Sequence, residues 1–183
     1  GLNRLYGAGM SRGELEGLGA RLGSDVPFCV AGGARLSHGR GEILSDAPVF
    51  PDCRIIVAIG KERASTPRQF ALLDRLFGNF EDRQSDTAKF DAFMASVKNG
   101  ELHGTARYMY NIFEATGCRD ESAIEIMKSN GAVGGLMSGS GSAVFGLFDD
   151  PKTSTAACGA LKTAGYMAFD TSPVYNFREE EIS

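Results

Sequence analysis

Two stretches of this sequence have residue types and spacing suited to chemistry on a phosphate-bearing molecule. The first centres on Asp25, within Leu22-Gly23-Ser24-Asp25-Val26-Pro27-Phe28. One interpretation is a helix N-cap, whose carboxylate accepts backbone N–H groups of the next turn. The other is a general base, which must be ionised and held in place, as a helix N-terminus can do. Position alone favours the cap, and the two roles are compatible.

The second stretch is the glycine- and serine-rich segment 131–142, which contains Ser138, Gly139, Ser140 and Gly141. Glycines allow positive φ angles and a close approach of the backbone to a phosphate, and successive N–H groups there form an anion-binding nest. A tight turn between two strands explains the pattern equally well. The segment is neither a Walker A loop nor a dinucleotide-binding fingerprint, because no Gly-Lys-Ser/Thr follows and the glycines precede a strand.

The elements before residue 60 place Asp25 between two helices. Ser11 and Glu14 form a capping-box pattern that predicts a helix start, and Pro27 suits the first turn of a second, short helix. Residues 34–37 and 42–44 are predicted strands around a turn at 38–41, and the β-branched run 53–59 is a predicted buried strand.

The second half changes to mostly helical patterns. A helix is predicted from Thr66 onwards, and the polar stretch 79–88 is predicted as a linker. The remaining expected elements are helices at 90–97, 101–115, 121–129 and 151–164, and strands at 143–148 and 166–174. Early strands, then helices, then β-α-β indicate an α+β fold.

Bulk properties narrow the class of protein. With 43% hydrophobic and 23% charged residues among 183, the chain can build a globular core. A net charge of −4 argues against broad nucleic-acid binding, and no run is long enough for a membrane span. The four cysteines lie far apart, which argues against a zinc site and fits a reducing cytoplasm. His38 and His103 are lone residues with expected surface roles.

Three motifs in order resemble one family. The Asp25 stretch with the following Gly-Gly and Gly-x-Gly-Glu, the segment Asn111-Ile112-Phe113-Glu114, and Met-Ser-Gly-Ser-Gly-Ser-x-Val-Phe-Gly at 137–146 are similar to GHMP kinases. Within that family they resemble the kinases that phosphorylate the 2-hydroxyl of 4-diphosphocytidyl-2-C-methyl-D-erythritol in isoprenoid biosynthesis. The resemblance implies ATP as phosphoryl donor and the end of a GHMP N-terminal domain at 1–60. Residues 61–183 would then be a ferredoxin-like α/β-sandwich C-terminal domain.

The resemblance also implies roles for individual residues. Asp25 would be the catalytic base, and Phe70 would stack on the cytosine of the substrate, although a core role on its helix fits Phe70 equally well. Thr66 would lie near the substrate diphosphate. Ser138, Gly139, Ser140 and Gly141 would form the loop that closes against the nucleotide.

Parts of the family pattern are absent from these 183 residues. The chain contains neither the catalytic lysine of the first motif nor the glycine-serine loop of the second, which would hold the ATP phosphates and Mg²⁺, and Leu136 replaces a basic residue. Because phosphoryl transfer needs these parts together, we expect a fragment that is inactive alone. An exposed apolar interface would favour self-association, and a homodimer is left open. Another GHMP kinase, or a non-catalytic binding module, remains an alternative.

Overall fold

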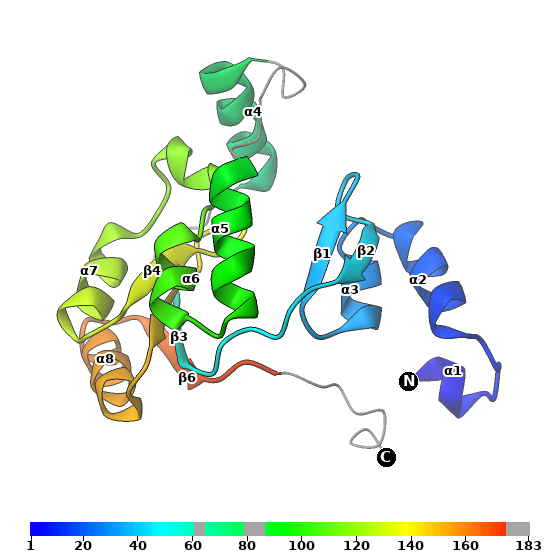
Figure 1. The fold of residues 1–183 in the computed structure, drawn as a ribbon. Coiled ribbons are helices and arrows are strands. Elements are labelled where there is room, and N and C mark those ends of the chain that lie inside the picture. The colour runs from blue at the N-terminus through cyan, green and yellow to red at the C-terminus, as the bar shows by residue number, and fades with distance from the viewer. Residues whose placement is uncertain (61–64, 79–86, 175–183) are drawn as a thin grey trace. The chain divides into compact units, whose positions relative to one another are not determined.

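A computed structural model describes residues 1–60, 65–78 and 87–174. The chain forms two compact units, which are each described by themselves. Unit 1 contains residues 1–49, and unit 2 contains Phe50–Pro173 (Figure 1). No helix in the described ranges has both the length and the apolar run that crossing a bilayer requires.

Unit 1 consists of short helices followed by a hairpin. Its helices are α1 (Leu2–Leu5), α2 (Arg12–Ala20) and α3 (Val26–Ala31). The capping box that begins α2 is confirmed, because Ser11 Oγ accepts the Glu14 N–H at 3.3 Å and a Glu14 carboxylate oxygen accepts the Ser11 N–H at 2.8 Å. Helices α2 and α3 pack against each other at Gly19, where an added Cβ would lie 3.0 Å from a Val26 methyl group.

The hairpin of unit 1 follows the sequence prediction. Strands β1 (Arg35–His38) and β2 (Ile43–Asp46) pair antiparallel, with Arg35 opposite Asp46 and His38 opposite Ile43. An ion pair between Arg35 and Asp46 adds a side-chain link at the open end of the hairpin. The turn of the hairpin lies at residues 39–42, one residue later than the sequence prediction of 38–41, because His38 still pairs with Ile43.

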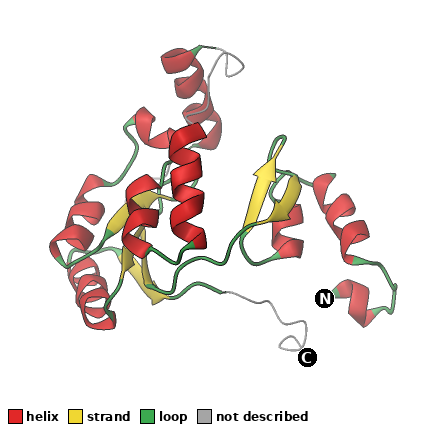
Figure 2. Ribbon diagram, in the orientation of Figure 1, coloured by secondary structure: helices red, strands yellow, loops and turns green. Residues whose placement is uncertain are grey.

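Unit 2 is built on a four-stranded antiparallel sheet (Figure 2). Its strands are β3 (Arg54–Ile59), β4 (Gly134–Met137), β5 (Val144–Phe148) and β6 (Met167–Thr171), in the order β4-β5-β3-β6. The helices between β3 and β4 are α4 (Thr66–Phe77), α5 (Thr87–Lys98), α6 (Leu102–Tyr108), the 3-10 helix η2 (Ile112–Thr116) and α7 (Glu121–Ser129). Helix α8 (Pro151–Thr163) joins β5 to β6. This strand order and the β-α-β-β-α-β connection confirm the ferredoxin-like prediction.

Alternation along the strands gives the sheet two apolar faces. One face packs against α7 and α8, and its centre includes Ile56, Val144 and Phe148, all fully buried. The other face carries Leu147 and packs against Leu102 of α6. Both clusters of buried apolar side chains among the described residues therefore lie in unit 2, one on each face of the sheet that carries β4 and β5.

Three details differ from the sequence predictions. The helix expected over 101–115 is split into α6 and η2, because Met109 leaves the helical conformation and Asn111 starts a new turn by capping. Residues 134–137 of the glycine-rich segment form strand β4, because Gly134 and Gly135 pair with β5. Strand β3 belongs to the sheet of unit 2, so the compact units divide near residue 50.

The predicted family-domain boundary at residue 60 stays a prediction. The linker predicted at 79–88 falls mostly outside the described residues, and its last two residues belong to α5.

Candidate functional site

Asp25 occupies the N-cap position of α3 without acting as a side-chain cap. Its backbone is helical, with φ −85° and ψ −13°, and no cap hydrogen bond is made by its side chain. A residue that caps with its side chain has an extended backbone instead. The prediction of a capping carboxylate was therefore wrong. Within the described residues the exposed Asp25 carboxylate accepts no hydrogen bond from the protein, which leaves it open to a ligand.

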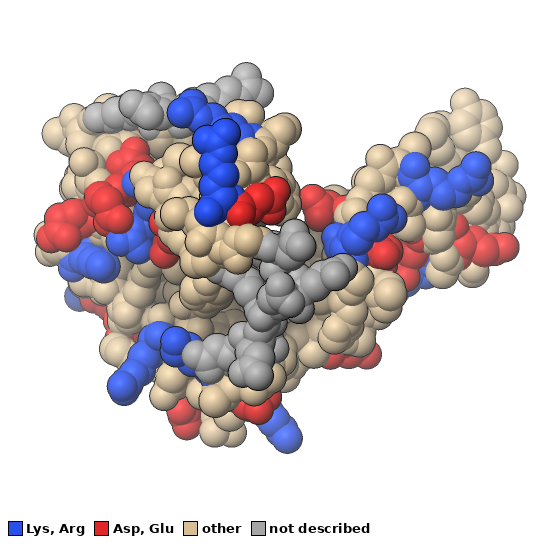
Figure 3. Space-filling view, turned by 90° about the horizontal axis from the view of Figure 1, so that it is seen from above, with Lys and Arg blue, Asp and Glu red and all other residues tan. Residues whose placement is uncertain are grey.

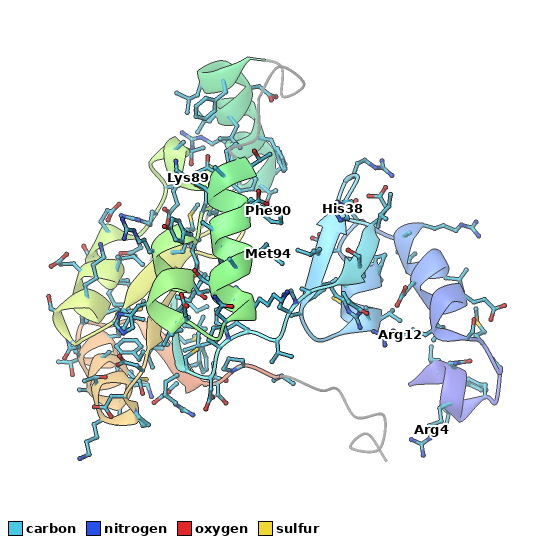
Figure 4. The ribbon with its side chains drawn as sticks, viewed as in Figure 1. Arg4, Arg12, His38, Lys89, Phe90 and Met94 are labelled. Carbon is cyan, nitrogen blue, oxygen red and sulfur yellow. The ribbon has the colours of Figure 1, made fainter. Side chains whose placement is uncertain are left out.

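The hairpin turn of unit 1 runs beside Asp25. Gly41, with φ +110°, lies so close that an added Cβ would be 3.9 Å from an Asp25 carboxylate oxygen. Glu42 holds this turn by accepting the Arg40 N–H at 2.7 Å. Hydrogen bonds from backbone N–H groups, its own first and that of Arg40 next, lower the pKa of Glu42. His38 lies at the same end of the hairpin and is exposed (Figure 4).

The glycine loop, defined here as Ser138–Ser142, connects β4 to β5 in unit 2. Two backbone hydrogen bonds shape it. The Ser138 N–H donates to the Ala143 carbonyl oxygen at 2.8 Å, and the Gly141 N–H donates to the Ser138 carbonyl oxygen at 3.0 Å. Gly139 and Gly141 have φ angles of +54° and +85°, which favour glycine. In the described part of the chain, the N–H groups of Gly139, Ser140 and Ser142 have no acceptor. Such a group of unpaired amides can bind an anion.

The segment Asn111–Glu114 supports the beginning of the glycine loop. The side-chain amide of Asn111 donates to the carbonyl oxygens of Met137 at 2.7 Å and Gly139 at 2.8 Å. The same side chain caps η2 by accepting the Phe113 N–H at 3.0 Å. Glu114 accepts the Met137 N–H at 2.9 Å. The segment that carries the second family-like motif therefore lies directly against the third.

Two further contacts hold the tip and the end of the loop. The hydroxyl groups of Thr66, at the start of α4, and Ser140 lie 2.7 Å apart. Gly60 N–H, just after β3, donates to the Ser142 carbonyl at 3.2 Å. An added Cβ at Gly60 would lie 2.4 Å from that oxygen, so this approach requires glycine. The loop is thus fixed to the central part of the sheet and to α4.

Phe70 lies one turn after Thr66 on α4 and is 49% exposed. Its ring meets Phe113 edge to face, with centroids 5.0 Å apart and planes at 84°. A half-exposed ring that is held from one side can still offer a face for stacking. Both sequence interpretations therefore remain compatible, since one part of Phe70 packs and another is open.

Near the segment that supports the loop, one arginine side chain contacts two carboxylates. Arg119 contacts Glu114 at 3.2 Å and Glu121 at 2.7 Å. The hydrogen bond to Glu121, followed by the charge of Glu114, raises the pKa of Arg119. Lys and Arg side chains on the face in Figure 3 occur in several separated groups, with Asp and Glu between them. No group of three or more potential metal ligands occurs among the described residues.

The structure brings together the unit 2 members of the predicted site. Thr66 contacts the glycine loop directly, and Phe70 contacts η2, whose cap Asn111 bonds to the same loop. Asp25 belongs to unit 1, so its surroundings are those of that unit. The loop-holding bonds of Asn111 and Glu114 were not predicted. A partial signal was the N-cap residue type of Asn111 directly before a hydrophobic pair.

Comparisons with known proteins agree with these features. The family described as "GHMP kinases C terminal" matches residues 119–166. A 4-diphosphocytidyl-2-C-methyl-D-erythritol kinase from Gloeobacter violaceus is 35% identical over 166 residues, which cover 88% of this chain and 54% of the relative. One from Lachnoclostridium phytofermentans is 32% identical over 171 residues, covering 91% and 56%. The chain thus spans about half the length of the curated relatives it matches.

Solved structures show the same relationship. The crystal structure of a 4-(cytidine 5'-diphospho)-2C-methyl-D-erythritol kinase is 28% identical, with a TM-score of 0.72, and the match covers 93% of this chain and 60% of the other. Homoserine kinase from Cytophaga hutchinsonii, 16% identical with a TM-score of 0.69, shares the fold. Together with the α+β sandwich and the glycine loop, these matches show that the chain is similar to GHMP kinases, and that residues 119–166 match the model of their C-terminal region.

Proposed function

We propose that the protein carrying this chain transfers the γ-phosphoryl group of ATP to the 2-hydroxyl of 4-diphosphocytidyl-2-C-methyl-D-erythritol. The observation that carries this proposal is the similarity, over 88–91% of the chain, to kinases named for that substrate. Homoserine and mevalonate kinases match the fold at 16% and 13% identity, which supports the architecture alone. The substrate assignment therefore rests on the more similar group.

In this proposal each part of the site has one task. The Asp25 carboxylate, open in unit 1, accepts the proton of the 2-hydroxyl as its oxygen attacks the γ-phosphorus, and ADP leaves. The unpaired N–H groups of the glycine loop bind phosphate oxygens. Phe70 stacks on the cytosine, and the Thr66 hydroxyl binds near the diphosphate.

ATP and Mg²⁺ complete the proposal. Mg²⁺ would neutralise charge on the transferred phosphoryl group when bound. The described residues contain no cluster of three metal ligands, so no step is assigned to a metal site in this chain. A cytoplasmic location is part of the proposal, because its four free cysteines fit a reducing compartment.

A homodimer is also proposed, because Met167 and Phe169 of edge strand β6 are 64% and 52% exposed. Sedimentation at micromolar concentration checks the assembly. A monomer over the whole concentration range would remove the dimer from the proposal.

The function is tested with the protein expressed from its full coding sequence. We expect ATP-dependent formation of the 2-phosphate from the diphosphocytidyl substrate, and no turnover of homoserine or mevalonate. Turnover of either competitor at a comparable rate would contradict the substrate assignment. Substrate binding without turnover in that protein would favour a non-catalytic binding module.

A second measurement uses the 183-residue chain. We expect Phe70→Leu to weaken CDP binding about tenfold, because stacking on one base contributes on the order of 1–3 kcal/mol. Phe90→Leu is the matched control: Phe90 is 52% exposed, on α5 (Figure 4). Equal affinities for the two variants would remove Phe70 from the site.

A further inference from the structure

The 3-10 helix η2 and its cap, residues 111–116, contact the two functional parts of unit 2. On one side they bond to the beginning of the glycine loop, and on the other they pack against α4. This short segment thus joins the loop to the proposed base-stacking ring, in addition to the direct contact between Thr66 of α4 and Ser140. We name this segment the bridge.

The loop side of the bridge is made of directional hydrogen bonds. Asn111 uses both hydrogens of its side-chain amide, for Met137 at 2.7 Å and Gly139 at 2.8 Å. Glu114 accepts the Met137 N–H at 2.9 Å, while its other carboxylate oxygen pairs with Arg119 at 3.2 Å. These contacts tie the position of the bridge to that of the beginning of the loop.

The α4 side of the bridge is made of one ring contact and one buried polar contact. Phe113 meets Phe70 edge to face at 5.0 Å. The Thr116 hydroxyl donates to the side-chain oxygen of Gln69, which is 2% exposed. An edge-to-face ring pair and a buried polar contact both restrict relative motion, and together they restrain Phe70 relative to the bridge.

We propose that the bridge couples occupancy of Phe70 to the order of the glycine loop, with Asn111 and Glu114 acting as positioning residues. This inference rests on the proposed function, in which a cytidine diphosphate group binds at Phe70. A base stacked on Phe70 restrains that ring, the restraint passes through Phe113 to Asn111 and Glu114, and the loop amides are held for the nucleotide phosphates. Binding of the cytidine-containing substrate thereby prepares the loop for ATP.

The first experiment tests the loop side without any ligand. In Asn111→Asp the side chain keeps its capping oxygen but loses both donors to the loop, and a carboxylate then faces two carbonyl oxygens. We expect amide hydrogen exchange at Ser138 and Gly141 to become about tenfold faster, followed residue by residue by NMR.

The control for this experiment is Asn130→Asp. Asn130 donates its side-chain amide to Ile126 at 2.8 Å, before β4 and away from the loop. The control leaves loop exchange unchanged if the proposal holds. Equal acceleration in both variants, or none in Asn111→Asp, overturns the positioning role.

A second pair of variants tests Glu114 by conservative rescue. Glu114→Gln keeps an oxygen for the Met137 N–H, whereas Glu114→Ala removes it. We expect loop exchange close to that of the unaltered chain in the first and about tenfold faster in the second. Equal exchange in the two variants contradicts a positioning role for this oxygen.

The coupling itself is tested with CDP as the probe. In the unaltered chain, saturating CDP slows exchange at Ser138 and Gly141 about fivefold or more. In Phe113→Leu, which keeps an apolar side chain against the core but lacks the ring, CDP still binds and the slowing is lost.

The outcomes separate the two proposals. CDP that binds the unaltered chain without slowing loop exchange overturns the coupling alone. Absence of CDP binding by the 183-residue chain at millimolar concentration overturns the coupling and the stacking role of Phe70, whereas the proposed function is decided by the turnover assay on the protein expressed from its full coding sequence. In that case the exchange difference between Asn111→Asp and Asn130→Asp still decides the positioning role.

Discussion

The two units use the same residue types at helix starts in different ways. In unit 2, Asp120, Asp150 and Asn111 all accept a backbone N–H with their side chains and so stabilise a helix. In unit 1, Asp25 stands at the same kind of position and accepts none. The difference teaches that a carboxylate at a helix start can either hold its own helix or, like Asp25, stay out of the hydrogen bonding of its fold, as the proposed general base must.

Packing differs between the units in the same direction. Unit 2 contains both clusters of buried apolar side chains found in the described part of the chain. In unit 1 the buried helix residues are small: Gly19, Pro27 and Ala31. The glycine loop is therefore supported by a packed hydrophobic core, whereas Asp25 lies on short helices that bury only small side chains.

The largest expected effect tests this packing difference. Phe148→Ala removes a fully buried ring from the core of unit 2, and we expect its free energy of unfolding to fall by about 3–5 kcal/mol. Phe28→Ala in unit 1, where the ring is 43% exposed, is expected to cost less than about 1 kcal/mol. Urea denaturation followed by circular dichroism measures both, and equal losses would contradict the comparison.

The next prediction concerns the helix starts directly. Asp120 accepts the Ala123 N–H at 3.0 Å and the Tyr166 hydroxyl at 2.9 Å, so Asp120→Ala is expected to cost about 1–2 kcal/mol of stability. Asp25→Ala is expected to change stability by less than about 0.5 kcal/mol, because no such bond is lost.

For activity the order of the two variants is reversed, and Asp25→Ala has the larger expected effect. In the protein expressed from its full coding sequence, Asp25→Ala is expected to lower kcat about a hundredfold or more, as removal of a general base does. Phosphoryl transfer that persists in this variant would show that Asp25 is not the base. A large stability loss would instead restore the capping interpretation.

Much of this contrast could be predicted from the sequence, and part of it could not. Ser11 and Glu14 predicted their capping box correctly because the pattern is local, and the run 53–59 predicted a buried strand because its side chains are apolar. Asp25 was mistaken for a side-chain cap because its residue type is right while its backbone is helical.

The support of the glycine loop was beyond local reasoning. Asn111 and Gly139 are 28 positions apart, and Thr66 and Ser140 are 74 positions apart, so their contacts arise from the sheet order. The break between α6 and η2 was missed because the helical hydrophobic pattern continues through it. Only the three-dimensional arrangement shows that this break presents Asn111 to the loop.

The reactivity of one cysteine in each unit also tests the difference in packing, with a smaller expected effect. Cys29 in unit 1 is exposed, whereas Cys53 in unit 2 is buried. Burial, with a smaller contribution from the charge of Asp52, raises the pKa of Cys53 to about 11. Since the thiolate is the reactive form, we expect iodoacetamide at pH 8 to label Cys29 and leave Cys53 unlabelled until the chain unfolds. Mass spectrometry of labelled peptides checks this, and rapid labelling of Cys53 would mean that unit 2 opens readily.

The smallest expected effect is a pH dependence in unit 2. A hydrogen bond from Arg119 is the main cause that lowers the pKa of Glu121 in the folded state. Its contribution is therefore present above the ordinary pKa of glutamate and is lost as the pH falls through the lowered folded value. Glu121 is 71% exposed, so Glu121→Gln should cost less than about 1 kcal/mol at pH 7. The difference from the unaltered chain should vanish in acid, as denaturation at pH 7 and pH 3 would show.

The contact between Gly60 and the Ser142 carbonyl limits how the loop length can vary. Both ends of the loop are tied down, one through Met137 and the other through Gly60, while Thr66 meets Ser140 near the middle. Residues inserted between Gly139 and Ser140 would have to bulge outward, because Asn111 holds the Gly139 carbonyl and Thr66 holds the Ser140 hydroxyl on either side of the insertion. Engineering of this loop would therefore tolerate new residues at Gly139–Ser140 and reject them next to Ser142, whose carbonyl lies so close to Gly60 that even a methyl group there has no room.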